Sequence, residues 1–433
     1  GAMSPAHHEA FWRRVMDVAE AHLSGPRAPE TPQPSGGGEE EAIPEDPETR
    51  RAAQAVRSVA VLLASFVEEA LDAWRGKALP AAFVEAASRC QEMLLALSCH
   101  ETQAFIAHAL EKLSTGDIVG REDYYGGLLM YLVGRCLEPG AAAADFDRLY
   151  RVRDLIGELD WDHESIESMK LQLMRCIANP NFARSSHGPD MIALFYTVHP
   201  GFTAEVNSTV KNQALYSRTG ALKAYSSALY KALKLGQAGA RLQVEFCVQD
   251  WAMLAVRSQR RSAERARSML EELHRHHHEE AVNELLCRSY GPVLWRSLKV
   301  ANSQVRENAT RLLQYTFPLL PGELGVADRE SELTKQIRFL RETLEDPNEP
   351  VRRVGVGAVS VVLKNYWDML PPGDIAELLT VLMNKCARDR KAPLVRAAVC
   401  EGFSCILNNA LSHPSMEAIL PQIADLLNDR APV

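Results

Sequence analysis

The stretch GPVLWRSLKVANSQVRENATRLLQYTFPLL, residues Gly291–Leu320, contains two apolar helical segments separated by the five-residue stretch ANSQV, whose final valine opens the second segment. The second segment begins at Val305, and the same arrangement returns with restarts at Val351 and Val395. The three valines are 46 and 44 residues apart, a period that is typical of a repeated two-helix unit. The stretch therefore predicts pairs of helices that recur along the chain.

Each second helix of these units carries one stripe of small or apolar side chains. The stripes are Val305, Ala309, Leu312 and Thr316; Val351, Gly355, Ala358 and Val362; and Val395, Val399, Phe403 and Ile406. One hairpin cannot bury such a stripe, so neighbouring hairpins must stack against one another. We therefore predict an all-α superhelical solenoid of antiparallel helix pairs.

Proline and asparagine residues support the predicted starts of the second helices. Pro350 and Pro393 fit the first turn of a helix, where no backbone donor is lost. Asn302 or Ser303, and Asn348, are candidate N-caps.

An arginine follows each of the three valines, and it has two interpretations. In the structural interpretation, each arginine binds a carboxylate of an adjacent turn; in the other, it contacts a ligand. The arginines are Arg306, Arg352 and Arg396, and the suitably placed carboxylates are Asp346, Asp389 and Asp429.

The chain divides by composition into four segments. Residues 1–3 resemble a scar of an expression vector, and residues 4–24 form an amphipathic helix. Residues 25–50 are rich in Pro, Gly and acidic side chains and predict a disordered linker. Residues 51–433 predict the helical array, which ends inside a repeat because LLNDRAPV at the end aligns with LEDPNEPV at Leu344–Val351.

No pattern typical of an enzyme is found. The 433 residues are 46% hydrophobic and carry a formal net charge of -8, but no Gly-rich phosphate loop, nucleophile elbow or paired metal-ligand motif. The nine cysteines lack zinc or redox spacing and predict reduced, buried thiols of an intracellular protein. We expect no cofactor and no metal, and the most apolar window, from Ser58, is too short and too charged to span a membrane.

The run HRHHHEE at His274–Glu280 leaves two readings open. His274 and His278, four apart on a helix, have the spacing of metal ligands, but a solvated helix end fits the run better because no carboxylate partner is evident. Asp160, Trp161 and Asp162 fit a turn or cap better than an acid–base pair.

Positive charge is concentrated between Val206 and Leu270. Eleven basic residues face three acidic ones there, which leaves about +8 on the segment and about -16 on the rest of the chain. Such a patch is typical of phosphate-backbone binding, although a solvated face or a dock for an acidic peptide fits the charge as well. The DNA-binding candidates are Lys211, Lys223, Lys231, Lys234, Arg257, Arg260, Arg261, Arg265 and Arg267.

The arginine-rich part of this segment predicts a helix start. Ser262 is the expected N-cap, with Arg260 and Arg261 on the loop or first turn before it. Arg265 and Arg267 are expected just inside the helix, where positive charge opposes the helix dipole and phosphate binding would explain it.

Several polar strings in Leu149–Val433 carry a family resemblance. They include VNSTVKNQ, FCVQDW, CRSYGPVLWRSLKVANSQVRENA, LEDPNEPVRRVGV, NYWDMLPP and LNNALSHP. With these strings the chain resembles the non-SMC G subunits of condensin II, which are HEAT-repeat proteins. Before Leu149 the resemblance is confined to strings such as EAFWRRVMDV.

The resemblance implies a non-enzymatic subunit that acts in mitotic chromosome condensation and segregation. It implies a nuclear, chromosomal protein that binds the kleisin subunit, meets the SMC subunits through kleisin, and grips double-stranded DNA without sequence preference. The alternative is a docking scaffold without DNA contact, which would bind kleisin or a short motif of a regulator such as microcephalin. No membrane partner is expected.

Overall fold

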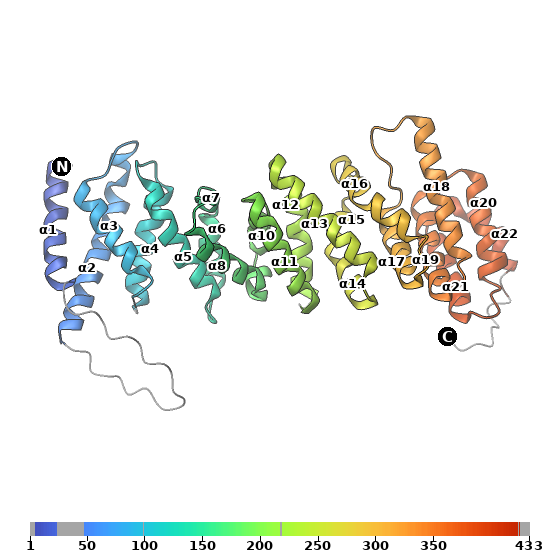
Figure 1. Cartoon of the computed structure of the whole chain (residues 1–433), viewed down its shortest axis with the longest axis horizontal. Coiled ribbons are helices and arrows are strands. Elements are labelled where there is room, and N and C mark those ends of the chain that lie inside the picture. The colour runs from blue at the N-terminus through green and yellow to red at the C-terminus, as the bar shows by residue number, and fades with distance from the viewer. Residues whose placement is uncertain (1–4, 24–46, 98, 217–218, 423, 425–433) are drawn as a thin grey trace, which may run out of the picture. The chain divides into compact units, whose positions relative to one another are not determined.

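The computed structural model describes all residues except 1–4, 24–46, 98, 217–218, 423 and 425–433. Within these described ranges every regular element is helical and no strand occurs, as predicted (Figure 1). The expectations for the scar, for most of the linker and for Asp429 lie outside the described residues. No helix in the described part is both long and apolar enough to cross a membrane.

Two compact units divide the chain, residues 1–187 and 188–433. The first unit contains α1 (Pro5–Leu23), α2 (Pro47–Ala70), η1 (Leu71–Trp74), α3 (Ala81–Leu94), α4 (His100–Thr115), η2 (Arg121–Tyr124), α5 (Tyr125–Leu137), α6 (Ala143–Arg151), α7 (Asp154–Gly157), α8 (Ile166–Ala178) and α9 (Pro180–Ala183). Helix α2 begins at Pro47, so the last four residues assigned to the linker are helical, which corrects the predicted boundary at residue 50.

The second unit contains α10 (Gly188–Thr197), α11 (Pro200–Tyr216), α12 (Thr219–Leu235), α13 (Ala238–Arg257), α14 (Arg260–Met269), α15 (Glu271–Arg275), α16 (Glu280–Ser297), α17 (Ser303–Thr316), α18 (Val326–Leu344), α19 (Glu349–Tyr366), α20 (Pro372–Val381), η3 (Leu382–Cys386), α21 (Pro393–Ile406), η4 (Ala410–Ser412) and α22 (His413–Ile419). Its helices follow one another in chain order (Figure 1).

Aromatic side chains hold the first helix onto the first unit. Trp12 of α1 is fully buried, and its ring meets Phe66 of α2 and Phe83 of α3 edge-on at centroid distances of 5.5 and 4.9 Å. The carboxylate of Glu9 accepts the backbone N–H of Ala82 at 3.3 Å, near the start of α3. Helix α1 is thus part of the first unit's core.

The predicted repeats are the pairs α16/α17, α18/α19 and α20–η3/α21. Helix α17 packs on α19, and α19 packs on α21, so the second helices stack directly. The three predicted stripes are buried in this stack, except that Val305 at the start of α17 is half-buried. Because the burial follows the stripes, the predicted helix-pair architecture is confirmed.

The helix starts also agree with the prediction. The Asn302 side chain caps α17 by accepting the N–H of Gln304 at 2.9 Å. Asn348 occupies the N-cap position of α19 without a side-chain capping bond. Pro350 and Pro393 lie in the first turns of α19 and α21.

Candidate nucleic-acid interface

The basic segment forms parts of α11, α12, α13 and α14, and ion pairs use three of its lysines. Lys211 binds Asp250, Lys231 binds Asp190 at 2.7 Å, and Lys234 binds Glu279 at 3.3 Å. The Lys234 ammonium also lies 4.5 Å from the centroid of the Tyr230 ring. Asp250 is one of the three acidic residues already counted in this segment, so only Asp190 and Glu279 offset part of its remaining charge of about +8.

Lys211 is in addition part of a polar network between α11 and α13. The Oδ1 of buried Asn207 accepts from Trp251 Nε1 at 2.9 Å, and its amide reaches Asp250 at 3.5 Å. Burial lowers the pKa of Lys211, the partner of the same Asp250. This lysine is therefore engaged in packing two helices.

Helix α14 begins earlier than predicted, which changes the roles of four arginines. Its N-cap is Gln259 and not Ser262, and its side chain makes no capping bond. Arg260 and Arg261 are accordingly the first two helical residues, whereas Arg267 lies in the last turn, where a positive charge suits the helix dipole. The expectation that Arg267 opposes the dipole is wrong.

Arg265 and Arg267 point into the protein. Arg265 donates to the carbonyl oxygen of Ala214 on α11 at 2.7 Å. Arg267 lies 3.4 Å from Asn308 Oδ1 on α17, and burial lowers its pKa. Both side chains are half-buried, and their guanidinium groups are used by contacts to α11 and α17, which pack beside α14.

Five candidates are exposed, and four of them are not used by the ion pairs above, namely Lys223 on α12 and the three arginines Arg257, Arg260 and Arg261. The arginines flank the turn between α13 and α14. None of the four forms an ion pair with another residue in the described part of the chain. They are the part of the predicted set that remains available to a phosphate.

A hydrogen-bonded ladder joins this turn to the equivalent turns of the following helix pairs. The side-chain amide of Asn308 on α17 donates to the carbonyl oxygens of Val256 and Ser258 at 3.1 and 3.0 Å. Arg306 donates to the carbonyl oxygens of Val300 and Ala301 at 2.9 and 2.7 Å. Helix α17 thus ties the α13–α14 turn to the α16–α17 turn.

The arginines after the repeat valines continue the ladder. Arg306 binds both carboxylate oxygens of Asp346, at 2.7 and 2.9 Å, in the α18–α19 turn. Arg352 binds Asp389 in the next turn, at 2.7 Å, and Arg396 donates to the backbone carbonyl of Asp389 at 2.6 Å. The expected carboxylate pairing is present for Arg306 and Arg352.

Exposed cations therefore line one edge of the second unit, where consecutive turns lie next to one another. We call this set the basic turn row. Its members are Arg257, Arg260, Arg261, Lys299, Arg353, Arg388, Arg390 and Lys391. Within the described ranges no member forms an ion pair, whereas Asp346 and Asp389 of the same edge are used by the ladder.

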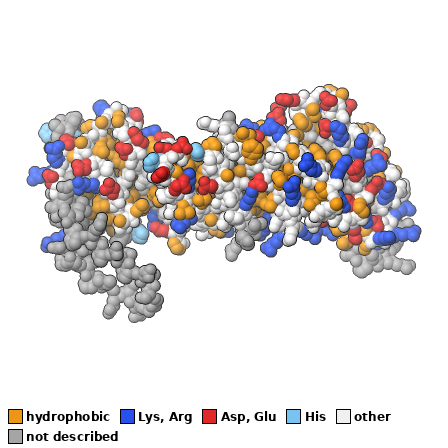
Figure 2. Space-filling view, in the orientation of Figure 1, with side chains coloured by type: hydrophobic (Ala, Val, Ile, Leu, Met, Phe, Trp, Pro, Cys, Tyr) orange, Lys and Arg blue, Asp and Glu red, His pale blue; other side chains and the backbone are white. Residues whose placement is uncertain are grey.

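The face seen in Figure 2 shows how charge is distributed in each unit. Asp and Glu side chains gather in the α6–α8 region of the first unit, while Lys and Arg side chains are spread over the second. Counting charge along the sequence found Arg257, Arg260 and Arg261 but missed Lys299, Arg353, Arg388, Arg390 and Lys391. Their recurrence after each first helix of a repeat was the available signal.

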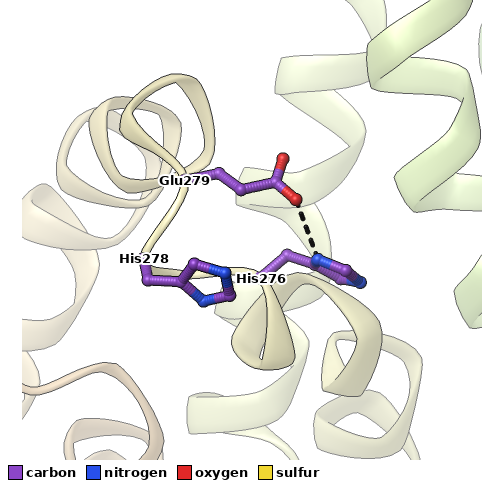
Figure 3. Close-up of side chains that lie close together, drawn as sticks. All are labelled: His276, His278 and Glu279. Atoms are coloured by element: carbon purple, nitrogen blue, oxygen red, sulfur yellow. Dashed lines mark hydrogen bonds and ion pairs between the residues drawn. The ribbon is translucent and has the colours of Figure 1, made fainter.

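In the histidine run, His274 and Arg275 end α15, residues 276–279 form the turn, and Glu280 begins α16. His274 is buried and bonds the Tyr290 hydroxyl at 3.0 Å, and burial lowers the pKa of His274 to about 3. The favoured interpretation as a solvated helix end is therefore wrong for His274, and the alternative pairing of His274 with His278 as metal ligands is wrong too, since the structure instead groups His276, His278 and Glu279. His276 Nδ1 lies 2.9 Å from Glu279 (Figure 3).

Residues 175–320 match the family model of the condensin II non structural maintenance of chromosomes subunit. The chain is 31% identical over 317 residues to the condensin-2 complex subunit G2 of Homo sapiens, which covers 72% of this chain and 28% of the relative. The same subunit of Mus musculus is 29% identical over 314 residues, with the same two coverages. The chain thus spans about 28% of the length of these curated relatives.

A solved structure of Kap121p is also similar, with a TM-score of 0.38 and 12% identity over 98% of this chain and 48% of that chain.

Proposed function

Because this chain belongs to the family of condensin II non-SMC subunits, we propose that it binds double-stranded DNA without sequence preference as a non-catalytic part of a condensin II complex. In this proposal it binds kleisin, meets the SMC subunits through kleisin, and acts on chromosomes in the nucleus during mitotic condensation and segregation. The relatives are named for a complex and not for a reaction.

The basic turn row is the observation that carries the DNA proposal. Its cations are exposed and lack ion pairs among the described residues, so binding phosphate breaks no existing pair. The rigid ladder beneath it holds successive turns in place, which reduces the entropy lost on binding. A row of cations contacts the phosphates of the DNA backbone and not the base edges. The proposal therefore predicts binding without sequence preference.

The α13–α14 turn is the strongest point of the row. Arg260 and Arg261 occupy the first turn of α14, where positive charge opposes the helix dipole by about 0.3–1 kcal/mol. The uncapped first turn leaves backbone N–H donors for an anion, beside the two guanidinium groups. A phosphate at this place would offset the unfavourable charge.

The test replaces Arg257, Arg260 and Arg261 together by Glu and measures binding to a labelled duplex at several salt concentrations. We expect at least about tenfold weaker binding and a salt slope that falls by about one unit per lost phosphate contact, for unrelated duplex sequences alike. The melting temperature should change little, because exposed charges contribute little to stability.

The matched control makes the same change in net charge elsewhere in the second unit. Arg329, Lys335 and Arg338 of α18 are exposed and lie outside the turns, so their replacement by Glu should weaken duplex binding much less. Equal losses in both triple variants would mean that only net charge matters, and the proposal for the turn row would be rejected.

A second candidate function, a protein-docking scaffold, is favoured by two exposed apolar side chains. Leu242 and Phe246 of α13 are 51% and 54% exposed and, four residues apart, share one helix face. Replacing both by Ser should leave duplex binding unchanged. The scaffold function is the correct one if this variant no longer binds a kleisin fragment while the triple variant of Arg257, Arg260 and Arg261 keeps full affinity for the duplex.

A further inference from the structure

From the geometry of the turn between α15 and α16 we infer a transition-metal site of Zn²⁺ type, formed by His276, His278 and Glu279. One ligand atom of each residue lies within 4.8 Å of the others. Figure 3 shows the two imidazole rings and the carboxylate on one short turn, with the hydrogen bond from His276 to Glu279. Two imidazoles and a carboxylate are ligands that zinc and its neighbours bind well.

The distances require only a small adjustment. With zinc–ligand bonds of about 2.0–2.1 Å, tetrahedral ligand atoms lie about 3.3 Å apart. His276 and Glu279 are already 2.9 Å apart. His278 is exposed, so its ring is free to rotate by the remaining distance of at most about 1.5 Å. Water would complete the coordination.

The groups behind the ligands give independent support. Metal-binding histidines usually direct their second ring nitrogen at a carboxylate, which fixes the ring and raises its basicity. In His276, Nδ1 faces the ligand Glu279, and the second nitrogen, Nε2, lies 3.6 Å from the Glu272 carboxylate, within ion-pair distance. The Tyr230 ring stacks on His276 at 4.2 Å with an interplanar angle of 12°.

Glu279 is held in a comparable way. The Tyr230 hydroxyl donates to its Oε1 at 2.8 Å, and Lys234 lies 3.3 Å from its Oε2. Two of the three ligands are thus oriented by α12 before any ion binds, and only His278 moves.

The local charge suits a cation although two basic groups are close. The surrounding charged groups are Glu271, Glu272, Glu279 and Glu280, against Arg275 and Lys234. The excess of carboxylates favours a divalent ion, and the ion would hold the α15–α16 turn together, since all three ligands belong to that turn.

The experiment titrates Zn²⁺ into the chelator-treated full chain, under reducing conditions, by calorimetry, with Co²⁺ absorption as a second readout. In His278→Ala, one equivalent of tightly bound Zn²⁺ should be lost. In Glu272→Gln, the affinity of this site for Zn²⁺ should fall about tenfold to a hundredfold. Zn²⁺ should raise the melting temperature of the wild type more than that of His278→Ala. His278 is exposed and bonds nothing in the core, so this variant should fold normally.

His163→Ala is the matched control, because His163 is an exposed histidine in the first unit that bonds only Ser165. It should keep the full stoichiometry of the wild type. The inference is overturned if the wild type binds no Zn²⁺ tightly, if His278→Ala binds it as the wild type does, or if His163→Ala loses as much as His278→Ala. None of these results depends on DNA binding.

Discussion

Arg306 and Arg352 show how one side chain joins two turns of different helix pairs. Each guanidinium binds a carboxylate of the next turn and backbone carbonyl oxygens of its own. The side chains of Arg306 and Asp346 are only 13% and 9% exposed. Removing one partner would leave the other charge buried and unpaired.

We expect Arg306→Ala to lower the free energy of unfolding by about 3–5 kcal/mol, the range for breaking a buried pair. Arg341→Ala is the control, since Arg341 and its partner Glu377 are 41% and 48% exposed, and exposed pairs contribute about 0–1 kcal/mol. Urea unfolding of the two variants measures both values. Similar losses in the two would show that burial does not set the strength of the ladder.

His274 makes stability depend on pH. Its pKa is lowered to about 3 by burial, whereas an unfolded histidine has a pKa of about 6.5. Below pH 6.5 the unfolded chain therefore binds one proton more, and the free energy of unfolding falls by about 1.4 kcal/mol per pH unit toward pH 3. Above pH 6.5 the contribution is complete.

The measurement compares urea unfolding at pH 7 and pH 5 in the wild type and in His274→Gln. Carboxylates titrate in both proteins, so their effects cancel. The wild type should lose about 2 kcal/mol more between the two pH values than the variant. Parallel pH profiles would mean that His274 is protonated in the folded state.

At the scale of elements, close packing of α18 against α19 depends on Gly355. A Cβ on this glycine would lie 2.6 Å from Oγ1 of Thr343 and 3.0 Å from its backbone carbonyl carbon. The Thr343 backbone belongs to α18 and cannot move without shifting the helix. Gly357, on the same helix α19, has open space around its Cβ position.

Gly355→Ala should therefore reduce the free energy of unfolding by about 1–3 kcal/mol, as overpacking does. Gly357→Ala should instead raise it by up to about 1 kcal/mol, because alanine favours the helix. Thermal unfolding of both variants tests the pair. A stabilised Gly355→Ala protein would show that the two helices separate at little cost.

At the scale of the whole molecule, a segment rich in Pro, Gly and acidic residues connects α1 to α2 along the chain. Aromatic contacts pack α1 against α2 and α3. The composition of residues 25–50 predicts ready cleavage by proteases. Trp12, buried between Phe66 and Phe83, should then keep the cut α1 bound to the first unit.

Limited proteolysis followed by gel filtration tests this expectation. The α1 peptide should elute with the body in the wild type and separate from it in Trp12→Ala, which loses the buried ring. Phe11→Ala is the control, since Phe11 is 41% exposed. Release of α1 from the cut wild type would contradict the prediction.

The sequence by itself determined the all-helical class and the repeat period, and it placed aspartates where Arg306 and Arg352 could pair with them, while leaving ligand contact as the alternative. These features depend on periodicity and on turns that recur at a nearly constant spacing, and both can be read along the chain. The stripe from Val351 to Val362 illustrates this, because its burial follows from helical spacing alone.

Only the tertiary structure decided which cations stay available and which groups meet at the histidine turn. The partners of Lys211, Arg265 and Arg267 lie 39, 51 and 41 residues away, so a local count of charge could not identify them as engaged. In the same way, Tyr230 reaches Glu279 from 49 residues away. Charge and ligand geometry depend on which helices stack, and stacking brings together residues that no local pattern connects.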